Sequence, residues 1–143
     1  LNERFTQTFT PGVRTNFKVA PNISLRYRYS ITNNVQGSRE TKFITKVPSL
    51  EFDAFIVEKF TFKTNYSLTT QDQVDGESES FQIWEATLSY RKNKDAKWEY
   101  EFKGTNLLNV NSQVRNNANN ISVFNSVTFI QPRFLTFRVV YQL

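Results

Sequence analysis

The chain has 143 residues, 15% of them aromatic, with four glycines, four prolines and neither cysteine nor histidine. Without cysteine, disulfides, thiolate metal ligands and cysteine nucleophiles are excluded, and without histidine the commonest general base and metal ligand is missing. The net charge of +5 comes from lysines and arginines scattered singly along the chain, which favours a solvated surface over a nucleic-acid-binding patch. The mean hydropathy of -0.52 and the lack of a run of about 18 apolar residues exclude a transmembrane helix but leave a transmembrane barrel open.

The first two predicted strands cover residues 13–19 and 23–31, joined by a very short turn at residues 20–22. Apolar and polar side chains alternate along both segments, which is typical of strands with one apolar and one polar face. We expect residues 1–19 to form one long strand with a bulge near Pro11.

The next predicted strand runs from Phe43 to Ile56, and its apolar positions change from odd to even numbers across Pro48. One extra residue there, a β-bulge, would restore a single apolar face, and bulges tolerate proline. Shorter alternating segments predict further strands at residues 60–69, 84–91, 98–103 and 133–143. The chain therefore holds about seven strands in an all-β fold.

The predicted connections alternate in length: residues 20–22, 57–59 and 92–97 are short, whereas residues 33–40, 71–80 and 109–120 are long. Transmembrane barrels have tight periplasmic turns and longer outer loops. The alternation therefore predicts an antiparallel transmembrane β-barrel with a periplasmic C-terminus.

The predicted strand number bears on how much of a barrel the chain contains. Bacterial single-chain barrels have even strand numbers, so residues 1–143 are expected to be the C-terminal portion of a larger barrel domain whose N-terminal strands are absent. The chain has no methionine and no secretion signal at Leu1, as expected of a mature or cut product.

In a transmembrane barrel, the side chain of each strand residue faces either lipid or the lumen. The side chains expected to face lipid are Phe17, Leu25, Tyr27, Tyr29, Phe52, Phe62, Tyr66, Leu88, Tyr100, Phe102, Leu135, Phe137, Val139 and Tyr141. Those expected to face the lumen are Arg14, Arg26, Arg28, Glu51, Asp53, Lys63, Glu85, Glu99, Glu101 and Arg138. The last strand ends at the C-terminus with a stripe expected to act as the C-terminal assembly signal: Phe137, Val139, Tyr141 and Leu143.

Two segments near the C-terminus resemble a known family: WEYEFKGTNLLN at residues 98–109 and QPRFLTFRVVYQL at residues 131–143. They are similar to the end of the barrel domain in TonB-dependent-receptor-like outer membrane proteins of Bacteroidota. TKFITKVPSLEFDAF, at residues 41–55, also looks like that group, so the resemblance covers most of the chain. Such barrels typically end in an aromatic residue, whereas this chain ends in Leu143. The matching residues are Trp98, Asn106, Leu107, Leu108, Asn109, Pro132 and Arg133.

The resemblance implies a barrel of about 22 strands in the bacterial outer membrane, plugged by a separate N-terminal domain. A metal chelate, glycan or peptide would be held by the plug and outer loops, and uptake would be energised through a periplasmic segment. The partners it implies are outer-membrane lipid, the rest of the same barrel with its plug, and a surface lipoprotein or other outer-membrane complex subunits. Nucleic acid is not an expected partner.

Two other functions remain open at this point. One is a non-transporting barrel that scaffolds a protein-export or barrel-assembly complex. The other is a soluble lipocalin-like carrier, in which the stripe of residues 135–143 would line an inner cavity and the arginines would face solvent.

The carboxylates offer weak signals for chemistry. Glu51 with Asp53 and Glu99 with Glu101 have the spacing of paired glycosidase acids, but the residues between them belong to the apolar stripe. The acidic segment at residues 72–79 lacks the spacing of a calcium loop. We therefore expect no enzyme activity, no catalytic residues, no cofactor and no metal site.

Overall fold

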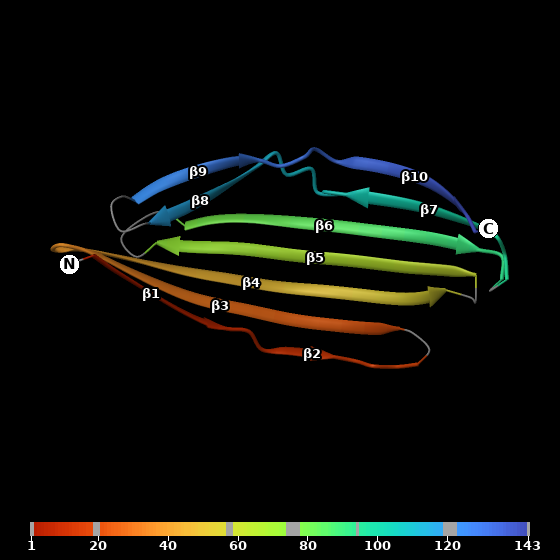
Figure 1. Cartoon of the computed structure of the whole chain (residues 1–143), viewed down its shortest axis with the longest axis horizontal. Helices are drawn as coiled ribbons and strands as arrows, with labels where there is room; N and C mark the ends of the chain where they lie inside the picture. Colours follow the sequence, from red (N-terminus) through yellow and green to blue (C-terminus); the bar gives the residue numbers. More distant parts are fainter. Residues whose placement is uncertain are drawn as a thin grey trace.

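The computed structural model describes residues 2–18, 21–56, 59–73, 78–93, 95–118 and 123–142. They form one open antiparallel sheet and one separate hairpin, with the two ends of the chain at opposite ends of the sheet (Figure 1). No helix within these ranges is long and apolar enough to cross a membrane. The predicted all-β antiparallel fold is therefore confirmed, and the sheet is not closed.

Eight strands make up the sheet, in the order β1-β3-β4-β5-β6-β7-β10, with β2 also paired to β3. The remaining two strands, β8 and β9, pair only with each other. The bounds are β1 Asn2–Phe9, β2 Gly12–Arg14, β3 Asn22–Gln36, β4 Arg39–Ile56, β5 Phe60–Gln73, β6 Ser78–Arg91, β7 Trp98–Thr105, β8 Ser112–Ala118, β9 Val123–Phe129 and β10 Phe134–Tyr141.

Strands β1 and β2 occupy a single position beside β3. Phe9 pairs with Tyr29 and Gly12 with Arg26, so both strands follow one register, and the Tyr27 N–H donates to the Pro11 carbonyl at 2.9 Å between them. The bulge predicted near Pro11 is therefore wrong, because no extra residue is inserted. The eight strands fill seven positions, as the sequence predicted.

The bulge predicted at Pro48 is also wrong. Strand β4 pairs with β3 without interruption, and its pairing with β5 breaks only at residues 47–48 before resuming in the same register. Proline has no N–H to donate, which explains the gap. Because nothing restores the parity, Phe43 and Val47 lie on one face of the sheet and Leu50 and Phe52 on the other.

The predicted alternation of short and long connections is not observed. Residues 33–40 are not a loop: two residues, Gly37 and Ser38, join β3 to β4, and Gly37 has the positive φ of 60° that tight hairpins require. The predicted loop at residues 109–120 contains β8 and leads into the hairpin with β9. Conversely, the strand predicted for residues 13–19 ends at Arg14.

The sheet has almost no interior. Among the described residues, Phe43, with 3% of its surface exposed, is the buried apolar side chain, and the buried polar ones are Asn34, Thr41 and Asn106. A soluble sheet normally buries one face against a second layer. Here most large apolar side chains lie at the surface instead.

Candidate functional site

The strand register sorts the side chains onto two faces, because directly paired residues of antiparallel strands lie on the same face. One face, called here the apolar face, contains an uninterrupted group of apolar and aromatic side chains from all seven positions. Its members are Phe5, Phe9, Val13, Ile23, Leu25, Tyr27, Tyr29, Leu50, Phe52, Ala54, Ile56, Phe60, Phe62, Tyr66, Leu68, Trp84, Ala86, Leu88, Tyr90, Trp98, Tyr100, Phe102, Leu135, Phe137, Val139 and Tyr141. The other face is called the polar face.

Strand pairing assigns every residue predicted to face lipid to the apolar face except Phe17, which lies outside the strands and has no paired position. It follows β2 in the connection to β3, where its backbone N–H donates to Asn22 Oδ1 at 2.8 Å. Every residue predicted to face the lumen lies on the polar face. Three residues of the predicted assembly signal lie together on β10, whereas Leu143 lies outside the described residues. Contact of these faces with lipid and lumen stays a prediction.

The apolar side chains of the apolar face form a band across the strands. On β3, β4 and β5 the band covers residues 23–31, 48–56 and 60–68. About nine residues of strand rise about 26 Å, or about 20 Å at a tilt of 40°. The lipid-facing band of outer-membrane barrels is about 25 Å tall, so the apolar band is of similar height but about 5 Å shorter.

Aromatic rings line the band at the end where β4 turns into β5 and β6 into β7. Tyr90 lies between Phe60 and Tyr100, with ring centroids 4.8 and 6.3 Å apart. Beside them, Trp98 of β7 contacts Tyr141 of β10 at 4.8 Å. The row crosses four neighbouring strands, and such aromatic belts are typical of membrane interfaces.

Strands β3 to β6 continue beyond the other end of the band, and there the two faces exchange character. On the band's own face, Lys46 Nζ lies 2.8 Å from Asp72 Oδ2, and the Ser78 hydroxyl donates to Asp72 at 2.5 Å. These bonds lower the pKa of Asp72, and the bond to Asp72 raises the pKa of Lys46. On the polar face of this extension, apolar Phe43 and Phe81 appear instead.

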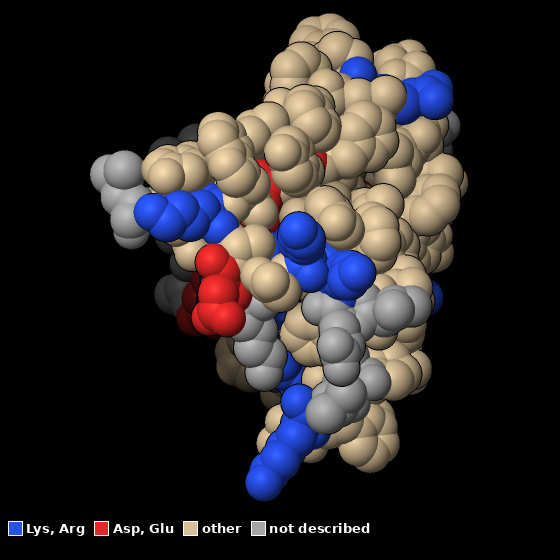
Figure 2. Space-filling model, turned by 90° about the vertical axis from the view of Figure 1, so that its right-hand side faces the viewer, with Lys and Arg blue, Asp and Glu red and all other residues tan. Residues whose placement is uncertain are grey.

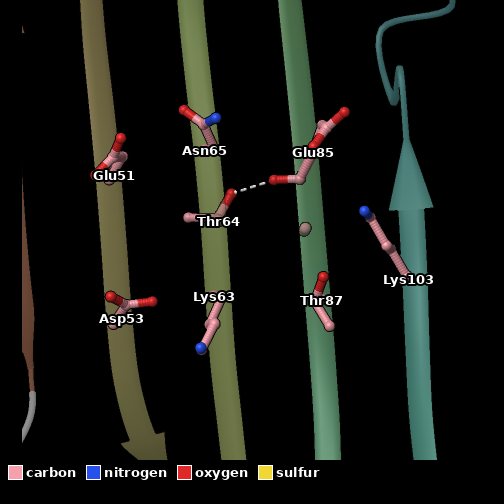
Figure 3. A pocket seen from close by; sticks show the side chains of 9 residues that line it. Glu51, Asp53, Lys63, Thr64, Asn65, Glu85, Thr87 and Lys103 are labelled. Carbon is pink, nitrogen blue, oxygen red and sulfur yellow. Dashed lines mark hydrogen bonds between the residues drawn. The ribbon is translucent and has the colours of Figure 1, made fainter.

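The polar face is hollowed between β4 and β7 (Figure 3). This cavity has a volume of about 210 Å³, and Lys103 leans over it from β7 toward β6. Next to it, Arg138 Nη2 of β10 bonds Glu101 Oε2 at 2.9 Å. The lining residues are Glu51, Asp53, Lys63, Thr64, Asn65, Glu85, Ala86, Thr87 and Lys103.

This arrangement places acidic, basic and neutral polar side chains side by side on one face of the sheet. Glu51 pairs across the strands with Asn65, and Asp53 with Lys63. Within the described ranges, no group of three or more acidic side chains could hold a metal ion. Asp75 and Glu77 of the acidic segment lie outside those ranges.

The end of β7 carries a buried asparagine that sequence reasoning did not single out by role. Asn106 Nδ2 donates to the carbonyls of Val110 at 2.8 Å and Gln131 at 2.9 Å, and its Oδ1 accepts from the Val110 N–H at 2.9 Å. Asn106 and Asn109 both have positive φ, which asparagine tolerates better than most residues. Asn109 Oδ1 accepts from the Arg133 N–H at 3.2 Å. The NLLN motif thus ties the end of β7 to the segment before β10.

No protein-family model, curated protein or solved structure matches this chain.

Proposed function

We propose that this chain forms part of the wall of a transmembrane β-barrel in a bacterial outer membrane. The apolar band contacts lipid, and the polar face lines a water-filled lumen. The observation that carries the proposal is the band itself: it is continuous across all seven strand positions, and many of its side chains are exposed, Phe9 by 68% and Phe137 by 65%. A water-soluble monomer rarely exposes a contiguous apolar surface of this extent.

The soluble-carrier alternative needs the opposite arrangement. A lipocalin-like barrel would place the band around an inner cavity and the charged side chains outside. The hollow of this sheet lies on the polar face, among Glu51, Lys63 and Lys103. Hollow and charge on one side, with apolar surface on the other, favour a membrane wall.

The two edges of the sheet support closure by further strands. Within the described sheet, β1 with β2 at one edge and β10 at the other pair on one side only. Unpaired backbone N–H and C=O groups are too costly in hydrocarbon, so membrane-spanning sheets close into barrels. We propose that additional strands of the same barrel pair with these edges.

At the finer level, we propose that the barrel is TonB-dependent-receptor-like and takes up a substrate. The support is the resemblance through Trp98, Asn106 and Asn109 at one end of β7 and Pro132 with Arg133 before β10. Uptake requires a plug domain and an energy-coupling segment. A complete protein that lacks both would contradict uptake and favour the scaffold alternative.

Tryptophan fluorescence tests the membrane wall directly, because Trp84 and Trp98 are the two tryptophans of the chain and both lie on the apolar face. In vesicles of lipids with brominated acyl chains, we expect strong quenching of both and weak quenching by aqueous iodide. The matched control carries Trp84→Phe, Trp98→Phe and Thr87→Trp, which moves the fluorophore to the polar face. If the control is quenched by brominated lipid as strongly as the original chain, the proposed facing is wrong.

A further inference from the structure

Basic side chains gather at the end of the sheet where the aromatic row lies. Lys18, Lys59, Lys92 and Lys97 are exposed in the connections there, together with one described acid, Asp95. Figure 2, which faces this end, shows Lys and Arg side chains spread over it from top to bottom. We call these four lysines the basic rim.

The lysines of the basic rim adjoin the aromatic residues of the apolar band. Lys59 immediately precedes Phe60, and Lys97 immediately precedes Trp98. Lys97 Nζ also lies 5.7 Å from the centroid of the Tyr141 ring. A lysine in this position lays its aliphatic stem along apolar surface and presents its ammonium group at the edge of the band. The rim lysines and the aromatic rings therefore lie together at the same edge of the apolar band.

The opposite border of the band has a different charge balance. On the apolar face beyond the band, Lys42 and Lys46 are accompanied by Glu3, Glu40 and Asp72, and Lys46 is bonded to Asp72 at 2.8 Å. The cations there are therefore matched by acids, whereas the basic rim has four lysines to one described acid. The two borders present different electrostatic surfaces to whatever surrounds the sheet.

We propose that the basic rim binds the phosphate headgroups of an anionic phospholipid leaflet. The inference rests on the proposed function, since the band must lie in hydrocarbon for its rim to reach headgroups. Anionic phospholipid fits because its acyl chains match the band and its phosphates match the lysines, in one continuous surface. Each lysine near an anionic membrane surface contributes about a fivefold gain in affinity.

The test compares uptake of the barrel protein that contains this chain into phosphatidylcholine vesicles and into vesicles with about one third phosphatidylglycerol. We expect the unchanged chain to prefer the anionic vesicles, and the Lys59→Gln, Lys92→Gln, Lys97→Gln triple variant to lose about 100-fold of that preference. The matched control, Arg26→Gln, Arg28→Gln and Lys42→Gln, removes the same charge elsewhere and should keep the preference. High salt should abolish it.

The outcomes separate this inference from the proposed function. Equal uptake of the unchanged chain into both vesicle types overturns the basic rim but leaves the membrane wall intact. An equal loss in the triple variant and in the control also overturns the rim, because net charge alone would then explain the preference. If the barrel protein that contains this chain enters neither type of vesicle, both the rim and the wall are wrong.

Discussion

The apolar band and the strand extension beyond Pro48 share the same strands and the same register, yet their faces have opposite character. In the band, Leu50 and Phe52 of β4 lie on the apolar face. In the extension, the same face carries Lys46, and the apolar side chain Phe43 lies on the opposite face with 3% exposure. One continuous strand therefore satisfies two different surroundings along its length.

This difference teaches how a barrel wall can project out of a membrane. Within hydrocarbon the outward face must be apolar and the inward face can be polar. Outside it the outward face meets water, and apolar groups become more stable on the inward side. On the proposed function, the exchange near Pro48 marks the height at which the strands leave the membrane.

The largest expected loss of stability comes from a substitution in the strand extension. Phe43→Ala should lower the free energy of unfolding by about 3 kcal/mol, because it empties a buried position of a large side chain. Denaturant titration in lipid bilayers of two thicknesses measures it. The loss should be the same in both bilayers, since Phe43 lies outside the band; a strong dependence on thickness would contradict the comparison.

The next largest loss of stability is expected from a charged substitution in the apolar band. Leu135→Arg should destabilise the inserted chain by about 2 to 4 kcal/mol, because Leu135 lies beside Gly104 in the middle of the band, where the substitution places a charge in hydrocarbon. Arg138→Gln, on the polar face of the same strand, should be nearly silent for folding. Equal costs for the two substitutions, measured by the same titration, would show that the strand does not separate lipid from water.

A smaller effect tests the junction between β7 and the hairpin. Asn106→Ala should cost about 2 kcal/mol, because two carbonyls and one N–H lose their partner at a position with 4% exposure. Asn109→Gly keeps a residue that accepts positive φ at an exposed site and should cost less. Thermal unfolding of the two variants distinguishes a buried junction from a loose one.

The smallest expected effect concerns the pH dependence of unfolding at the polar border of the band. The lowered pKa of Asp72 means that its ion pair with Lys46 stabilises the fold above the carboxyl's unfolded pKa. That contribution disappears as the pH falls through the lower, folded pKa. Asp72→Asn should remove this part of the acid dependence of unfolding, whereas Glu40→Gln should leave it unchanged. Identical pH profiles for Asp72→Asn and the unchanged chain would contradict the role of the pair.

Sequence periodicity located the strands well where one face is apolar and the other polar. It was wrong at residues 33–40, which extend β3 and β4 although they contain few apolar residues. A strand with water on its outer side has no strong alternation to detect, so its polar residues look like a loop. The bulge at Pro48 was wrong for a related reason, because it assumed that one face stays apolar along the entire strand.

The candidate site was predictable in part. Alternation alone assigned Arg26, Glu51 and Lys63 to one face and Phe137 to the other, since side-chain direction in a strand has a period of two. The basic rim was predictable only in part: residues 57–59 and 92–97 were predicted as turns at one end of the sheet, whereas Lys18 was predicted to lie in a strand and lies in a connection. The role of Asn106 was not predictable, because it depends on Gln131, which comes 25 residues later.

The sequence by itself determined that this protein is built from strands, roughly how many positions they fill, and which side chains share a face. Those properties follow from local backbone geometry and need no knowledge of distant contacts. Only the tertiary structure decided where the strands end, that Pro48 adds no bulge, and where the two faces exchange character. These depend on hydrogen-bond register between strands, which is set by partners remote in the chain.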